Sequence, residues 1–198
     1  MDIVVPQEST EVLKPRALFG GAMGVALPAR FADASVFRQV PDTQEVFVDG
    51  ATDQSVIVEL LELAGEVAAP QAAEFHFGSL AQDNAAREAA VQQQFAPVAI
   101  EHGGLRTMCV GTQTVAKFNE GAAAANRVLV CVAVFRLPHV TTDIVLSYNA
   151  VETISGQSSS AHVVDAQQLA GMTPQKTLAL FTRIVDTLTV NDYGLFVA

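Results

Sequence analysis

The chain of 198 residues has no tryptophan, two tyrosines and two cysteines. So few tryptophan and tyrosine side chains argue against a stacking platform for single-stranded nucleic acid. Two cysteines are too few for the disulfide framework of a small secreted domain, so we expect Cys109 and Cys131, both in apolar stretches, to be buried and reduced. The longest apolar run, residues 128–135, is much shorter than the ~20 residues of a membrane-spanning helix. We therefore expect no direct membrane insertion, and we find no recognisable secretory signal at the N-terminus.

Lysine and arginine are absent from residues 39–86, although this stretch carries nine acids. The other 150 residues carry 11 basic and 12 acidic side chains, so nearly all of the net charge of −10 lies in one quarter of the chain. Such a charge repels nucleic-acid phosphate and attracts a basic protein surface, which predicts a protein partner and no nucleic acid. A solvated acidic face that only improves solubility is the alternative. The nine acids are Asp42, Glu45, Asp49, Asp53, Glu59, Glu62, Glu66, Glu74 and Asp83.

Motifs of catalysis and of metal binding are also missing from the sequence. The four histidines are far apart along the chain, and there is no Cys-x-x-Cys, so we expect no metal site and no cofactor. No Gly-x-Ser-x-Gly marks a nucleophile, and the glycines at 20, 21 and 24 are not followed by Gly-Lys-Ser/Thr. Glu59 and Glu62 could form a carboxylate pair for acid–base chemistry, but recognition is the better interpretation. We expect a binding protein without a catalytic site.

Strand patterns dominate what the sequence does contain. Residues 45–49 and 55–62 flank Asp49-Gly50, which predicts a hairpin, although the end of the second segment could also form a helical turn. Further strands are predicted in segments rich in valine, threonine and isoleucine. These segments are residues 105–118, 127–137 and 141–149.

Two helices are expected between and after these strands. One covers residues 70–91, and the other begins at Thr173-Pro174 with an apolar face at spacings of three and four. Residues 1–16 are expected to be a flexible N-terminal extension, and residues 149–164 a surface loop. The prediction is one α+β domain over residues 17–198, with an antiparallel sheet packed by helices.

Short sequence motifs are more informative about the family of the chain than these patterns. The chain contains LFGGA (18–22), FADAS (31–35), RQVPDTQEVFVD (38–49), TDQSVIVELLE (52–62), FHF (75–77), RLP (136–138) and TD (142–143), in this order. This string closely resembles the Mog family, the Ran guanine-nucleotide release factors of nuclear transport. The match is dense over residues 18–62, sparse over residues 63–125, and recovers over residues 127–149.

The resemblance implies a Mog/PsbP-like fold, a curved antiparallel sheet flanked by helices. It also implies a protein of the nucleus and cytoplasm, monomeric alone, that binds the small GTPase Ran and promotes release of its guanine nucleotide in nucleocytoplasmic transport. A trafficking adaptor that uses the same acidic surface for another protein is the alternative. The Ran-binding positions implied by the resemblance are Asp33, Arg38, Asp42, Gln44, Glu45, Asp53, Glu59 and Glu62.

Local backbone geometry weakens the Ran-binding assignment of Asp42 and of the pair Glu59 and Glu62. Asp42 follows Pro41, so a turn-forming role suits it as well as a binding role. Glu59 and Glu62 are three residues apart, so on a regular strand they point to opposite faces. They share a face only if the strand ends or turns near Leu60 and Leu61.

Overall fold

A computed structural model describes residues 10–116, 120–162, 164, 167 and 171–196. The chain forms an eight-stranded antiparallel sheet of order β3-β4-β5-β10-β9-β8-β6, with β7 paired to β8, and a small sheet of order β1-β2-β11. The strands of the large sheet are β3 (Ala32–Asp33), β4 (Gln44–Asp49), β5 (Gln54–Glu62), β6 (Glu88–Gln94), β7 (Val98–Ala99), β8 (Leu105–Val115), β9 (Asn126–Leu137) and β10 (Thr142–Thr153). Those of the small sheet are β1 (Leu13–Leu18), β2 (Met23–Pro28) and β11 (Thr189–Val190).

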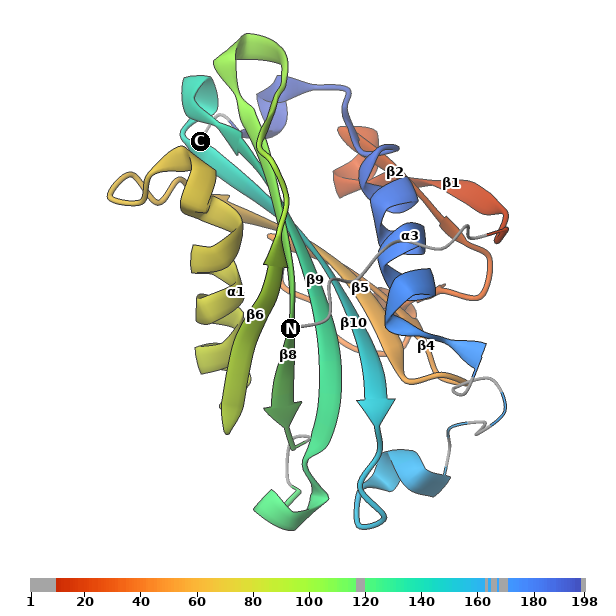
Figure 1. The fold of residues 1–198 in the computed structure, drawn as a ribbon. Helices are drawn as coiled ribbons and strands as arrows, with labels where there is room; N and C mark the ends of the chain where they lie inside the picture. The colour runs from red at the N-terminus through yellow and green to blue at the C-terminus, as the bar shows by residue number, and fades with distance from the viewer. Residues whose placement is uncertain (1–9, 117–119, 163, 165–166, 168–170, 197–198) are drawn as a thin grey trace.

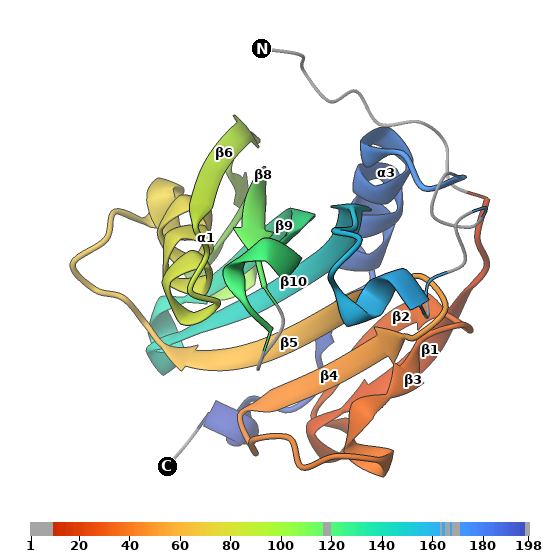
Figure 2. The same ribbon diagram turned by 90° about the horizontal axis from the view of Figure 1, so that it is seen from below.

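Two helices cover opposite faces of the large sheet (Figure 1). Helix α1 (Ala72–Asp83) packs on β8 and β9, and helix α3 (Pro174–Val185) packs between the large sheet and β2. Alternation along β10 assigns the faces, because Val145 belongs to the core under α1 while Ile144 and Leu146 belong to the core under α3. Figure 2 shows the small sheet beside α3, away from α1. The predicted α+β class is confirmed.

Several predicted elements are found where the sequence places them. The Asp49-Gly50 turn joins β4 to β5, and the backbone N–H of Ala51 donates to Asp49 Oδ1 at 3.0 Å. Thr173 caps α3 by accepting a hydrogen bond from the Lys176 backbone at 3.3 Å. Cys109 and Cys131 are buried free thiols, and burial raises the pKa of both. None of the helices in the described part of the chain is long and apolar enough to cross a membrane.

The predicted helix over residues 70–91 is too long. It starts close to Pro70 but ends at Asp83, and Ala85 has a left-handed φ of +48° that breaks the helical path. Glu88–Gln94 forms β6, paired with β8. The alanines and glutamines of this segment favour a helix locally, but the edge of β8 offers backbone partners on both sides of a register shift between Val91 and Gln93, and this tertiary pairing decides the outcome.

The two expected loose segments are also more ordered than predicted. Leu13–Leu18 forms β1 and pairs with β2 along its whole length, so residues 13–16 belong to the sheet; residues 1–9 lie outside the described residues. In the expected loop over residues 149–164, β10 continues to Thr153. Ser158 and Ser160 are then buried against Asn126, whose Nδ2 donates to Ser158 Oγ at 3.0 Å. A run of serines therefore anchors this segment instead of leaving it solvated.

Candidate functional site

The side chains of Gln44 and Glu59 form the centre of the candidate site. Their strands pair directly at this position, and Gln44 Nε2 donates to Glu59 Oε1 at 2.7 Å. The β4–β5 ladder stops here, so the last part of β5 has no β4 strand partner beyond a hydrogen bond from Leu60 N to Thr43 O at 2.9 Å. Asp42, two residues before β4 begins, and Glu62, the last residue of β5, are both exposed. The carboxylates of Asp42, Glu59 and Glu62 and the amide of Gln44 thus surround the end of β5 that β4 leaves unpaired.

Strand β5 continues to Glu62 without a helical turn, so the Glu59 and Glu62 side chains point to opposite faces of the sheet. Glu59 lies opposite Val145 and faces the side of the sheet that carries α1. Glu62 shares its face with Val58 and Leu60, which pack against the other core. A single partner surface reaches both carboxylates only by wrapping around the free edge of β5, which we define as the segment Leu60 to Glu62.

Asp33 and Arg38 lie beside β4, at the outer edge of the large sheet. Asp33 Oδ1 accepts a hydrogen bond from Ser35 N at 2.8 Å and so caps the short 3₁₀ turn η2 (Ala34–Val36). The Arg38 backbone donates to Ala34 O at 3.0 Å, and its side chain is exposed. Turn η2 packs against β4, so both residues belong to the same end of the fold as Gln44.

The other two expected positions have structural partners elsewhere. Glu45 Oε1 accepts a hydrogen bond from the Phe19 backbone at 2.6 Å, which ties β4 to the turn before β2. Asp53 lies in the β4–β5 turn with a φ of +52°, and it accepts a hydrogen bond from Ser160 Oγ at 2.6 Å. At roughly 3.3 Å per residue, Asp53 is about 30 Å from Glu62 along β5. The eight expected positions therefore do not form one cluster.

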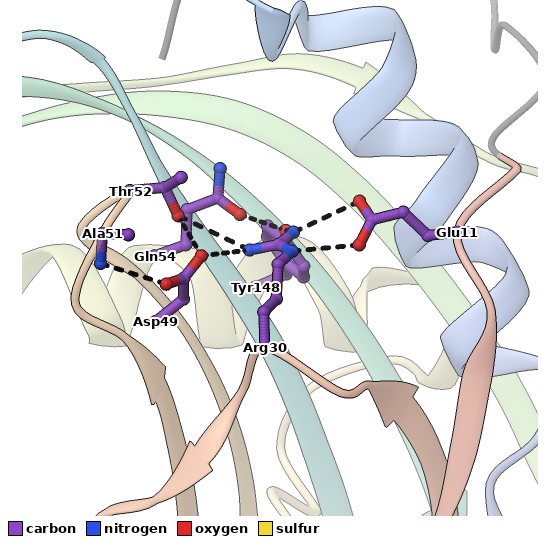
Figure 3. A network of polar contacts seen from close by, with 7 residues as sticks. All are labelled: Glu11, Arg30, Asp49, Ala51, Thr52, Gln54 and Tyr148. Atoms are coloured by element: carbon purple, nitrogen blue, oxygen red, sulfur yellow. Dashed lines mark hydrogen bonds and ion pairs between the residues drawn. The ribbon is translucent and has the colours of Figure 1, made fainter. Parts of the chain in front are cut away.

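The acidic quarter of the chain is less uniformly charged in three dimensions than in sequence. Figure 3 shows Asp49 turned inward onto Arg30, with Arg30 Nη1 at 2.7 Å from Asp49 Oδ2. Arg30 also contacts Glu11 at 2.9 Å and donates to the hydroxyl of the buried Tyr148 at 3.1 Å. Burial alone would raise the pKa of Asp49, but hydrogen bonds from Thr52 and Arg30 lower it overall. Asp49 is thus an internal ion-pair partner and not part of the acidic surface.

A buried Arg136–Asp143–His76 cluster, which is not among the expected site residues, supports the acidic end of the fold. Arg136 donates to both carboxylate oxygens of Asp143 at 2.8 and 2.7 Å, and His76 Nε2 lies 3.0 Å from Asp143 Oδ2. Burial would raise the pKa of Asp143, but the hydrogen bonds from Arg136 and His76 lower it to about 2. The three side chains are almost fully inaccessible to solvent. Asp143 is therefore ionised and paired inside the protein.

This cluster fixes the connection between β5 and α1. Arg136 donates to Val67 O at 2.6 Å and to Ala64 O at 3.1 Å, while the Ala64 backbone lies 3.3 Å from Asp143 Oδ2. The exposed acids Glu62 and Glu66 border or lie within the segment that is held in this way. His76 belongs to the FHF motif, Arg136 to the RLP motif and Asp143 to the TD motif of the sequence. The sequence does carry a signal for such a buried network, because each of these charged or imidazole side chains lies inside an otherwise apolar strand or helix pattern.

Comparison with known proteins places this arrangement in a family. Residues 16–151 match the family model described as "Ran-interacting Mog1 protein". The chain belongs to the Ran-interacting Mog1 family. Among its relatives, the Danio rerio Ran guanine nucleotide release factor is 37% identical over 188 residues, covering 91% of this chain and 98% of the relative. The Homo sapiens Ran guanine nucleotide release factor is 35% identical over 186 residues, covering 90% and 94%.

Solved structures give the same family and fold. The crystal structure of the Saccharomyces cerevisiae Ran-binding protein Mog1p superimposes with a TM-score of 0.70 at 27% identity, covering 95% of this chain and 100% of that one. The PsbP protein of Synechocystis matches with a TM-score of 0.53 at 11% identity, covering 92% and 94%, which is a likeness of fold alone. The expected Mog/PsbP-like fold is confirmed. Within the described residues of this Mog1-family chain, no group of three or more His, Cys, Asp or Glu side chains is placed to hold a metal ion.

Proposed function

We propose that this chain binds the GTPase Ran and promotes release of its guanine nucleotide, as a regulator of nuclear protein import. The observation that carries the proposal is membership of the Ran-interacting Mog1 family over residues 16–151. Relatives that align along nearly their whole length are named Ran guanine nucleotide release factors, and a yeast relative is named a nuclear import protein. The protein acts as a monomer without a catalytic site of its own, in the nucleus and the cytoplasm.

The free edge of β5 and its surroundings form the proposed Ran-binding surface. Asp42, Gln44, Glu59 and Glu62 contact Ran directly, with Asp33 and Arg38 at the rim beside β4. Glu45 fastens β4 to the turn before β2, and Asp53 is bound by Ser160 at the far end of the β4–β5 hairpin, so neither is assigned a direct contact with Ran. The carboxylates meet a basic patch, because like charges repel and the acidic segment contains no lysine or arginine.

Thermodynamic linkage explains how such a surface promotes release. A GTPase holds its nucleotide with backbone amides, a lysine and Mg²⁺. A partner that binds the nucleotide-free form more tightly than the loaded form lowers the affinity for nucleotide by the same factor. Carboxylates at the edge of the nucleotide site do this by competing for the basic groups that the phosphates use. No covalent chemistry is needed, which agrees with the absence of recognisable catalytic motifs in the sequence.

The deciding experiment is a nucleotide-release assay. Ran loaded with a fluorescent GDP or GTP analogue is mixed with the purified chain in the presence of excess unlabelled nucleotide. We expect the fluorescence to decay faster as the concentration of the chain increases, up to saturation. Binding without any acceleration would favour the adaptor function, and an absence of binding would refute the proposal as a whole.

A further inference from the structure

Two adjacent apolar side chains protrude beside the proposed surface. Val36 is 82% exposed and Phe37 is 62% exposed. The other exposed large hydrophobics within the described residues are isolated from one another in sequence. They are Val12, Phe75 and Val98. Single exposed apolar residues are ordinary, but phenylalanine is enriched at protein interfaces, and two adjacent exposed apolar side chains form a larger apolar patch than one.

The pair is held on a defined backbone and not on a loose loop. Asp33 caps η2 at its start, and Ala34 at its base is fully buried. At its end, the Phe37 and Arg38 backbones both donate to Ala34 O, at 3.2 and 3.0 Å. An anchor that is ordered before binding loses little conformational entropy when a partner covers it.

Strand register shows which end of the sheet the pair occupies. Strand β3 runs antiparallel to β4 and places Asp33 opposite Phe47. The chain therefore continues from Asp33 toward the Gln44 end of β4, and η2 packs against that strand. Turn η2 and the exposed pair that it carries thus lie toward the Gln44 end of β4, the end at which β5 also has its free edge.

We propose that Val36 and Phe37 form the apolar anchor of the Ran interface and insert into an apolar recess beside a basic patch on the partner. The inference rests on the proposed function and goes beyond it by assigning affinity and charge attraction to different residues. Carboxylates raise the association rate and select a basic partner, whereas buried aromatic anchors slow dissociation. Charge complementarity points to this occupant, because the exposed Asp42 and the half-buried Glu59 lie at the same end of β4 as the pair, although the exposed Arg38 directly follows Phe37.

The test separates these roles kinetically. Association and dissociation rates with Ran are measured on a biosensor for the wild-type chain and for Phe37→Ala. We expect Phe37→Ala to raise Kd at least about tenfold through faster dissociation, with an association rate within about twofold of wild type. Its melting temperature should stay within about 2 °C, because the side chain is exposed.

Val36→Ser and Val98→Ser form a matched pair of variants. Val98 is also exposed, at 43%, but lies on β7, beyond β8 and toward the opposite edge of the large sheet. We expect Val36→Ser to weaken binding at least about threefold and Val98→Ser to leave it unchanged.

A folded Phe37→Ala variant that binds like wild type, or equal losses in both valine variants, would overturn the inference while leaving Ran binding intact. If the wild-type chain does not bind Ran, both proposals fail. If the chain sediments as a dimer that Phe37→Ala makes monomeric, the occupant is a second copy and the inference is wrong.

Discussion

At the scale of single residues, Asp143 shows how an internal charge is tolerated. Its carboxylate has no contact with solvent, yet Arg136 and His76 and one backbone N–H satisfy its oxygens. A buried ion pair of this kind contributes little net stability compared with an apolar pair, but removal of one partner leaves an uncompensated charge. The effect of this ion pair here is geometric, because Arg136 donates its remaining hydrogen bonds to backbone carbonyl oxygens of the segment that follows β5.

The depressed pKa of Asp143 predicts a dependence of stability on pH. Its folded pKa of about 2 lies below the unfolded value, so the unfolded chain binds more protons between about pH 4 and pH 2. The stabilisation is fully present above pH 4 and falls by about 2 kcal/mol as pH falls through this window. We expect Asp143→Asn to cost about 3 kcal/mol at pH 5, and its deficit relative to wild type to shrink by about 1 kcal/mol at pH 3.

Urea denaturation at the two pH values measures this difference. Asp186→Asn is the matched control, because Asp186 pairs with Arg106 at 2.7 Å but is largely exposed. Such surface pairs contribute almost nothing to stability, so the control should follow wild type at both pH values. A deficit of Asp143→Asn that stays constant from pH 5 to pH 3 would show that the carboxylate is not held in its charged form.

At the scale of elements, β5 decides how the candidate site works. Alternation places Glu59 and Glu62 on opposite faces, and only the absence of β4 beyond Gln44 opens a path around the edge. We expect Glu59→Lys with Glu62→Lys to weaken Ran binding at least about thirtyfold, because like charges then meet a basic partner. Each single reversal should show part of this loss if one partner surface spans both faces.

The control for charge reversal needs acids without internal partners. Glu120 and Glu152 are unsuitable, since they bond to Ser158 and Arg127. Glu88 and Glu101 are exposed, and they lie on β6 and just after β7, away from β4 and β5. Reversal of both should leave the dissociation constant within about threefold of wild type, less than 1 kcal/mol. Equal damage in the control would mean that bulk charge, not a specific surface, governs the interaction.

The elements also show what local sequence can and cannot predict. The β4–β5 hairpin follows from Asp49-Gly50 between alternating segments, and α3 from Thr173-Pro174 and its apolar stripe. Strand β6 was missed because EAAVQQQ carries helix-forming residues, and only the edge of β8 makes it a strand. The family resemblance implies eight site positions, six of them within the acidic stretch of residues 39–86, but the internal partners of Glu45 and Asp53 are decided by contacts distant in sequence.

At the scale of the whole molecule, the uneven charge predicts that association is electrostatically steered. The screening length falls from about 30 Å at 10 mM salt to about 8 Å at 150 mM, so exposed acids act over a much shorter range at physiological salt. We expect the association rate with Ran to fall at least about fivefold between these two conditions, with a smaller change in dissociation. Stopped-flow mixing over a salt series measures both rates. An association rate independent of salt would contradict steering.

The small sheet has a consequence for synthesis of the chain. Strand β11 near the C-terminus pairs with β2 near the N-terminus, and the Asn191 backbone donates to Ala22 O at 2.8 Å. Helix α3, just before β11, fills the core between the two sheets. While these last residues are still in the ribosomal exit tunnel, β2 and one face of the long strands remain uncovered. The domain therefore completes its core only after β11 has left the tunnel, and a premature stop codon before α3 yields a chain that exposes apolar sheet surface to chaperones and proteases.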